Sequence, residues 1–152
     1  LLFSRGVGAV VTLDADGQHL PEEIPKLLAH AEAAALVIGG RELLFAEMSR
    51  LRRTSNRLSS VAISLAAGIR LGDVQSGFRL YTRRLVEATG FPESRFDAES
   101  AVVVRAARRG LRVLSVPVRL GFADGRLTSH YRPLVDSLRI AGAVARARLE
   151  AL

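Results

Sequence analysis

Apolar residues along this chain gather in short runs that predict buried strands. The valine-rich run at 7–13 and the run at 36–38 are continuous, as in strands buried on both faces of parallel α/β sheets. Residues 78–81 are predicted to form another short strand. At 112–120 apolar and polar residues alternate, which also predicts a strand. Pro117 lies within it and places it at a sheet edge or a bulge.

Helices are predicted between these strands, because apolar residues recur there at helical spacing. The first begins at Pro21, a residue favoured in the first turn. Longer helices are predicted at 47–67, ended by Gly68, and at 98–109. An amphipathic helix is predicted at 133–152. The strands and helices together predict a single α/β domain.

The predicted helix at 47–67 has an apolar face and a separate face that carries arginines. Its predicted apolar stripe consists of Leu51, Leu58, Ala62 and Leu65. Another face carries Arg50, Arg53 and Arg57 at spacings of three and four residues. Three guanidinium groups on one face can bind a phosphate by charge-assisted hydrogen bonds. An ordinary solvated helix face has the same spacing, so both interpretations stay open here.

Composition narrows the class of protein without identifying it. The chain has 152 residues, no cysteine and 49% hydrophobic residues, which describes a globular protein without disulfides or thiolate metal sites. No uncharged apolar segment reaches the roughly 18 residues of a membrane span. The chain lacks an initiator Met and opens almost on a strand, so we expect an upstream part to be missing.

The chain is strongly basic, with a net charge of +7 and a single lysine, Lys26. Arginine presents a planar set of donors that suits phosphate. Nucleic acid, anionic lipid and phosphorylated substrates all fit a positive surface. The arginines are dispersed and aromatic residues make up only 5%, which disfavours a nucleic-acid-binding module. That module remains the alternative without catalysis, and we expect no nucleic-acid partner.

The run Asp14-Ala15-Asp16-Gly17-Gln18-His19 directly follows the first predicted strand. Ligands bind at the carboxyl ends of strands in open α/β sheets, and two carboxylates there can hold Mg²⁺ on a phosphate-bearing substrate. A calcium EF-hand is excluded, because its sixth and twelfth positions would be His19 and Pro25. An aspartyl-phosphate phosphatase with Asp14 as nucleophile, or a helix-capping turn, remains an alternative. A metal–diphosphate site that includes Gln18 is favoured.

Two further segments concentrate polar side chains. Residues 73–79 place an acid, an amide, a hydroxyl and an arginine in one loop, which indicates either a site or a structural turn. Asp97 stands at the start of the predicted helix at 98–109, where an acid caps a helix. In a functional interpretation, Asp97 or Glu99 is a base or a ligand of sugar hydroxyls. His19 and His130 are too far apart in sequence to be paired by spacing.

In order and spacing these motifs resemble family 2 glycosyltransferases, in particular the branch with dolichyl-phosphate mannosyltransferase and bacterial polyprenyl-phosphate glycosyltransferases. The matching segments are residues 14–22, Gly39-Gly40-Arg41, Arg53 with 56–58, 73–81, 96–99, 116–118 and 129–131. The resemblance implies a GT-A fold, with a mixed, mainly parallel sheet flanked by helices and without the family's amino-terminal strands. Residues 1–132 are then a partial catalytic domain, and 133–152 a helix of that domain or of the juxtamembrane region.

The resemblance implies an inverting transfer of a sugar from a UDP- or GDP-sugar. In that reaction Asp14, Asp16 and Gln18 hold Mg²⁺ or Mn²⁺ on the donor diphosphate, and the metal makes Asp16 part of the catalytic machinery. A lipid-phosphate acceptor is already anionic and needs no strong base. A hydroxyl acceptor needs one, and Asp97 or Asp73 is then expected to supply it.

The resemblance also implies which residues bind donor or acceptor. They are Arg41, Arg53, Ser76, Arg79, Glu99, Ser129 and His130. Arg41 and Arg53 match arginines that bind the acceptor phosphate, whereas Ser129-His130 stands where the branch usually carries Gly-x-Ser-Lys. The expected partners are a nucleotide sugar, a polyprenyl or dolichyl phosphate, and the cytoplasmic face of a membrane. The helix at 133–152 is expected either to rest on that membrane or to pack on the sheet.

Overall fold

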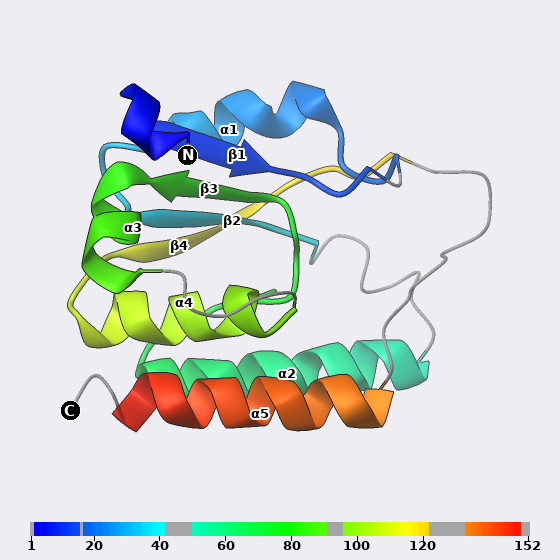
Figure 1. Ribbon diagram of the computed structural model, residues 1–152. Coiled ribbons are helices and arrows are strands. Elements are labelled where there is room, and N and C mark those ends of the chain that lie inside the picture. The colour runs from blue at the N-terminus through cyan, green and yellow to red at the C-terminus, as the bar shows by residue number, and fades with distance from the viewer. Residues whose placement is uncertain (1, 16, 42–49, 91–95, 122–132, 150–152) are drawn as a thin grey trace.

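The computed structural model describes residues 2–15, 17–41, 50–90, 96–121 and 133–149 (Figure 1). The strands are β1 Ala9–Thr12, β2 Leu36–Gly40, β3 Arg79–Thr82 and β4 Val113–Pro117. The α-helices are α1 Ile24–Leu28, α2 Arg50–Ala67, α3 Arg83–Thr89, α4 Phe96–Arg108 and α5 Pro133–Leu149. Single 3-10 turns lie at η1 Phe3–Arg5 and η2 Pro21–Glu23. The predicted α/β class is confirmed.

The described strands form one mixed sheet in the order β1-β3-β2-β4. β3 lies between β1 and β2 and is antiparallel to both, whereas β2 and β4 are parallel. The expectation of mainly parallel pairing is therefore wrong for this part of the chain, because β3 enters the sheet between two strands that run opposite to it. Among the described strands β4 has a neighbour on one side only, which confirms the edge position predicted from Pro117.

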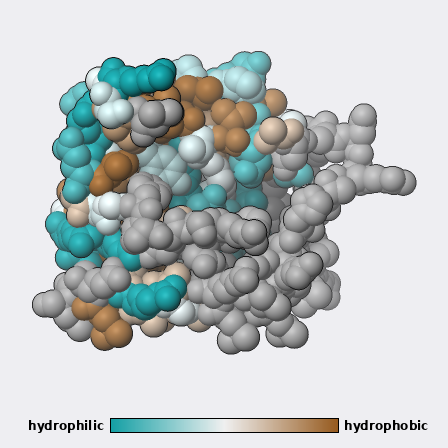
Figure 2. All heavy atoms as spheres, in the orientation of Figure 1, coloured by the Kyte–Doolittle hydropathy of each residue, from teal (hydrophilic) through white to brown (hydrophobic). Residues whose placement is uncertain are grey.

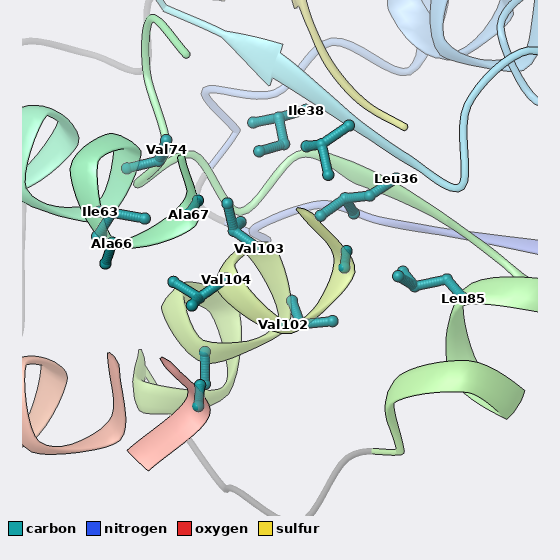
Figure 3. Packing of buried hydrophobic residues seen from close by; sticks show 14 of the residues in the cluster. Leu36, Ile38, Ile63, Ala66, Ala67, Val74, Leu85, Val102, Val103 and Val104 are labelled. Carbon is teal, nitrogen blue, oxygen red and sulfur yellow. The ribbon is translucent and has the colours of Figure 1, made fainter. Parts of the chain in front are cut away.

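Helices cover both faces of the sheet. Figure 1 shows α1 on one face, α4 on the other, and α2 and α5 side by side beyond α4. The side chains of β2 alternate between two cores: Leu36 and Ile38 pack with α4, and Val37 packs in the cluster that contains Leu27 and Phe78. In Figure 3, Leu36 and Ile38 point from β2 toward Val103 of α4. The buried strand predicted at 36–38 is confirmed.

The edge strand β1 and the helix α3 differ from the sequence-based expectation. Within the part of the chain that the structure describes, β1 pairs with β3 alone. Its residues are half-buried or exposed, so its predicted burial on both faces is wrong. α3 was not predicted, although Thr82 caps it: the Thr82 hydroxyl accepts a hydrogen bond from the Leu85 amide. The predicted helices at 47–67 and 98–109 correspond to α2 and α4.

α2 buries a different face from the apolar stripe seen in the sequence. Leu58, Val61 and Leu65 are 66%, 56% and 71% exposed. The buried face instead consists of Ser60, Ile63, Ala66 and Ala67. Small side chains let α2 pack closely on α4 and α5, so the larger leucines stay on the outer side. Within the described residues, no helix is both long enough and apolar enough to cross a membrane.

Candidate active site

The first carboxylate of the acidic turn lies against the loop at residues 73–77. The Thr12 hydroxyl donates a 2.9 Å hydrogen bond to the Gly77 carbonyl, which holds the end of β1 beside this loop. A Cβ atom at Gly77 would lie 2.8 Å from Asp14 Oδ1, so glycine lets the carboxylate lie against the loop in this orientation. The Asp14 side chain is 60% exposed. The carboxylate therefore lies against the loop on one side and is open to a ligand on the other.

His19 holds the same turn from its other end. The Asp14 amide donates a 2.9 Å hydrogen bond to His19 Nδ1, and the imidazole stacks on the Phe78 ring at a centroid distance of 5.3 Å. His19 is buried. The spacing of His19 and His130 along the chain does not reveal this contact. The sequence feature that could have predicted the contact is the position of His19, since a histidine five residues after Asp14 can fold back onto its amide within a tight turn.

The turn is also joined to the segment after β4. His19 pairs with Leu120 in an isolated antiparallel bridge, and the Gly121 amide donates a 2.9 Å hydrogen bond to the Gln18 carbonyl. Close by, the buried Glu23 carboxylate accepts from Arg119 Nε at 2.8 Å and from Lys26. Hydrogen bonds from Lys26, and then from Arg119, lower the pKa of Glu23 to about 2 in spite of its burial.

A buried ion pair joins the end of β2 to the loop at 73–77. Arg41 Nε donates to Asp73 Oδ2 at 2.6 Å, and Nη2 donates to Oδ1 at 3.2 Å. Asp73 is fully buried and also accepts from the Gln75 amide at 3.0 Å. Burial alone would raise the pKa of Asp73, but the hydrogen bonds and charge of Arg41 lower it below its usual range. This geometry disfavours Asp73 as a base and makes it the partner of Arg41.

Arg79 is fully buried, and its guanidinium binds backbone carbonyls. Its nitrogens donate to the carbonyls of Val74 and Glu99 at 2.6 Å and of Ser76 at 2.7 Å. The Ser76 hydroxyl is buried too and accepts from the Phe78 amide at 3.3 Å. Both side chains are therefore engaged within the protein, and their predicted roles as ligands of the sugar donor or the acceptor stay predictions. Both residues shape the loop that carries Gly77.

Glu99 lies in the first turn of α4 at the same edge of the sheet. Its side chain is 34% exposed, and its Oε2 atom lies 3.7 Å from Arg79 Nη2. Burial raises the pKa of Glu99, Arg79 opposes this, and the negative charge of Asp14 adds to the increase. The negative charge of Asp14 also contributes to raising the pKa of Arg41. The structure thus brings Asp14, Arg41, Asp73 and Glu99 together.

Several predicted site residues cannot be placed in this geometry. Asp16, Ser129 and His130 lie outside the described residues. Arg53 and Asp97 lie in α2 and α4, at positions whose side chains are not described. Among the described residues no group of three His, Cys, Asp or Glu side chains could hold a metal. The oxygen donors of Asp14 and Gln18 nevertheless suit Mg²⁺ or Mn²⁺, which bind carboxylates and carbonyl oxygens.

Comparison with known proteins gives consistent matches. Residues 3–90 match the sequence profile described as Glycosyl transferase family 2. The chain is 35% identical over 123 residues to undecaprenyl-phosphate mannosyltransferase of Micrococcus luteus, an alignment that covers 76% of this chain and 50% of that protein. It is 29% identical over 125 residues to polyprenol monophosphomannose synthase of Mycolicibacterium smegmatis, covering 75% and 46%.

A third relative aligns over a shorter region. The chain is 39% identical over 79 residues to undecaprenyl-phosphate 4-deoxy-4-formamido-L-arabinose transferase of Photorhabdus laumondii, covering 52% of this chain and 24% of that protein. The chain thus spans half, or less, of the length of these curated relatives.

Proposed function

The chain belongs to glycosyl transferase family 2, and from that premise we propose that it transfers a sugar from a nucleotide-sugar donor to a polyprenyl phosphate. The transfer inverts the anomeric centre and depends on Mg²⁺ or Mn²⁺. The names of the relatives support a lipid-phosphate acceptor. Family membership also replaces the phosphatase and nucleic-acid interpretations, which no contact in the described residues favours.

One observation carries this proposal: an exposed carboxylate and a fixed guanidinium lie at the same edge of the sheet. Asp14 rests on Gly77, and Arg41 is held by Asp73 from the same loop, residues 73–77. Transfer between two phosphorylated substrates needs both kinds of group. A carboxylate binds the metal of the donor, and a cation binds the anionic acceptor.

Asp14 and Gln18, together with Asp16, are the residues that would hold the metal. When bound, Mg²⁺ or Mn²⁺ neutralises the charge that grows on the departing nucleotide diphosphate. The chain's own contribution is to fix the turn that presents these oxygens. The contacts of Asp14 with Gly77 and His19, and of Gln18 with Gly121, serve that purpose.

Arg41 is the residue proposed to bind the acceptor phosphate. Asp73 accepts from Nε and Nη2, and the guanidinium has five N–H groups in all, so Nη1 can donate to an anion. The Arg41 side chain is 16% exposed. Because a lipid phosphate is already anionic, the reaction needs no strong base, which agrees with the paired state of Asp73. Arg53, Ser129 and His130 remain proposed acceptor ligands.

The lipid acceptor implies contact with a membrane, and we place this contact on the cytoplasmic face. The exposed stripe on α2, defined as Leu58, Val61 and Leu65, supports a contact with a membrane. These apolar side chains recur at helical spacing and so form one exposed face of the helix. Arg57 is exposed beside this stripe. An apolar patch also lies over the carboxyl-terminal end of α5 (Figure 2, lower left). Apolar side chains with flanking arginines suit an anionic bilayer surface.

A transfer assay with the complete protein tests the proposed function. Labelled nucleotide sugars are offered with undecaprenyl phosphate in the presence of Mn²⁺ or EDTA. We expect labelled lipid with Mn²⁺, none with EDTA, and a loss of at least about a hundredfold in Asp14→Asn. Glu22→Gln, the same chemical change at an exposed position, serves as the matched control. Donor consumption that is indifferent to EDTA and to Asp14→Asn contradicts the proposal.

A further inference from the structure

His19 contacts the backbone of Asp14. The hydrogen bond runs from the Asp14 amide to His19 Nδ1 at 2.9 Å, so this nitrogen is the acceptor and carries no proton. The neutral ring then has its proton on Nε2. Asp14 Oδ2 lies 3.7 Å from the same Nδ1 atom. One ring nitrogen therefore holds the amide of Asp14 and lies close to its carboxylate.

The imidazole itself is fixed by a second contact, with Phe78, which in turn packs on Gly39. The His19 ring stacks on Phe78 with an interplanar angle of 24°. Phe78 is fully buried, and it packs so closely on Gly39 that a Cβ atom there would lie 2.9 Å from Phe78 Cδ1. Gly39, Phe78, His19 and Asp14 thus form a continuous chain of contacts. It runs from β2, through the residue that precedes β3, to the acidic turn.

A metal ligand on an exposed turn needs such support. The Asp14 carboxylate is exposed, and on its inner side it meets the backbone of Gly77. A freely moving turn would have to be ordered each time the ion binds, which weakens binding. Residues that orient a ligand without touching the metal commonly contribute about tenfold or more to metal affinity. His19 is placed to do this through the amide of Asp14.

We propose that His19 is a positioning residue for the metal site, acting as a hydrogen-bond acceptor for the Asp14 amide while its ring is seated on Phe78. This inference rests on the proposed function, because it assumes that Asp14 binds the divalent cation. It assigns different tasks to two parts of one side chain. The Nδ1 atom fixes the metal ligand, and the ring face contributes to packing. Substitutions can separate the two.

Two variants of the complete protein make this separation. His19→Phe keeps an aromatic ring for Phe78 but removes the acceptor, whereas His19→Asn keeps an acceptor at the place of Nδ1 but removes the ring. The readouts are Mn²⁺ binding without substrates, measured by electron paramagnetic resonance, and the thermal midpoint of unfolding. We expect His19→Phe to weaken Mn²⁺ binding about tenfold with a midpoint near that of the wild type. We expect His19→Asn to bind Mn²⁺ within about threefold of the wild type although its midpoint falls.

The controls separate failure of this inference from failure of the proposed function. Wild-type protein that binds no Mn²⁺, or binds it equally well after Asp14→Asn, overturns the proposed metal site and the role of His19 with it. If Asp14→Asn abolishes binding but His19→Phe binds Mn²⁺ like the wild type, only the role of His19 is overturned. The same holds if Mn²⁺ affinity in both His19 variants simply follows their stability.

Discussion

Arg41 and Asp73 form a two-point ion pair, with Nε to Oδ2 at 2.6 Å and Nη2 to Oδ1 at 3.2 Å. The pair fixes the arginine that follows β2 against the loop before β3. Asp73 is therefore a support of the site rather than its base. The residues meet across 32 positions of sequence, so this pair also joins two motifs of the family into one surface.

Asp73→Asn is expected to destabilise the protein by about 3 kcal/mol, because it leaves the largely buried Arg41 without a charged partner. Urea unfolding measures the change. Glu87→Gln is the matched control, since it breaks the exposed Arg83–Glu87 pair at 3.9 Å and should cost no more than about 0.5 kcal/mol. Equal effects of the two substitutions would contradict the importance of the buried pair.

The pH dependence of stability should show the contribution of Glu23. Its pKa is lowered from 4.5 to about 2 in the folded protein, so its stabilising effect is complete above pH 4.5 and is lost as the pH falls through about 2. The difference in unfolding free energy between wild type and Glu23→Gln should therefore shrink from pH 5 to pH 2. Urea unfolding across this range tests it, with the exposed Glu22→Gln as control. A difference that does not change with pH contradicts the ion pairs of Glu23.

Gly77→Ala should reduce activity without unfolding the protein. The added Cβ would lie 2.8 Å from Asp14 Oδ1, and the exposed carboxylate can rotate away, so the fold survives while the metal ligand is displaced. We expect transfer activity to fall about tenfold to a hundredfold. At Gly8 the same substitution meets nothing within 4 Å, so Gly8→Ala should keep full activity. Wild-type activity in Gly77→Ala would show that Asp14 needs no fixed position.

The exposed stripe on α2 should contribute to membrane binding. Leu58→Gln together with Leu65→Gln is expected to lower the partition coefficient on anionic liposomes at least about tenfold, because two leucines lose their apolar contact with lipid. Flotation at low salt measures the bound fraction. Leu28→Gln is the matched control, since Leu28 is also exposed but lies on α1, on the other face of the sheet. Equal loss in both proteins contradicts a specific role of α2.

The sequence predicted the elements around the site better than it predicted their burial. The buried run at 36–38 and the edge strand with Pro117 were recognised because each has an unambiguous periodicity. In α2, apolar residues occur on more than one side, and periodicity cannot tell a close-packed face of small residues from an exposed stripe of leucines. The antiparallel placement of β3 depends on contacts between distant segments, which no local pattern contains.

The candidate site, too, was predicted only in part from the sequence. The motif at 14–19 and the loop at 73–79 were recognised as chemically important, and the structure brings Asp14 and Gly77 together. The sequence could not show that Arg79 is buried among backbone carbonyls, since an arginine in a polar loop has the same composition whether it binds a ligand or supports the loop. The acceptor role of His19 depends on the fold of one turn and was missed for that reason.

A comparison of two acceptor lipids tests the proposed function most directly. The complete protein should be given its labelled nucleotide sugar, Mn²⁺, and either a polyprenyl phosphate or the polyprenol of the same chain length. Because Arg41 is proposed to bind an anion and Asp73 is unavailable as a base, labelled lipid should form only with the phosphate. Transfer to the polyprenol at a comparable rate, or to neither lipid, would contradict the proposed function.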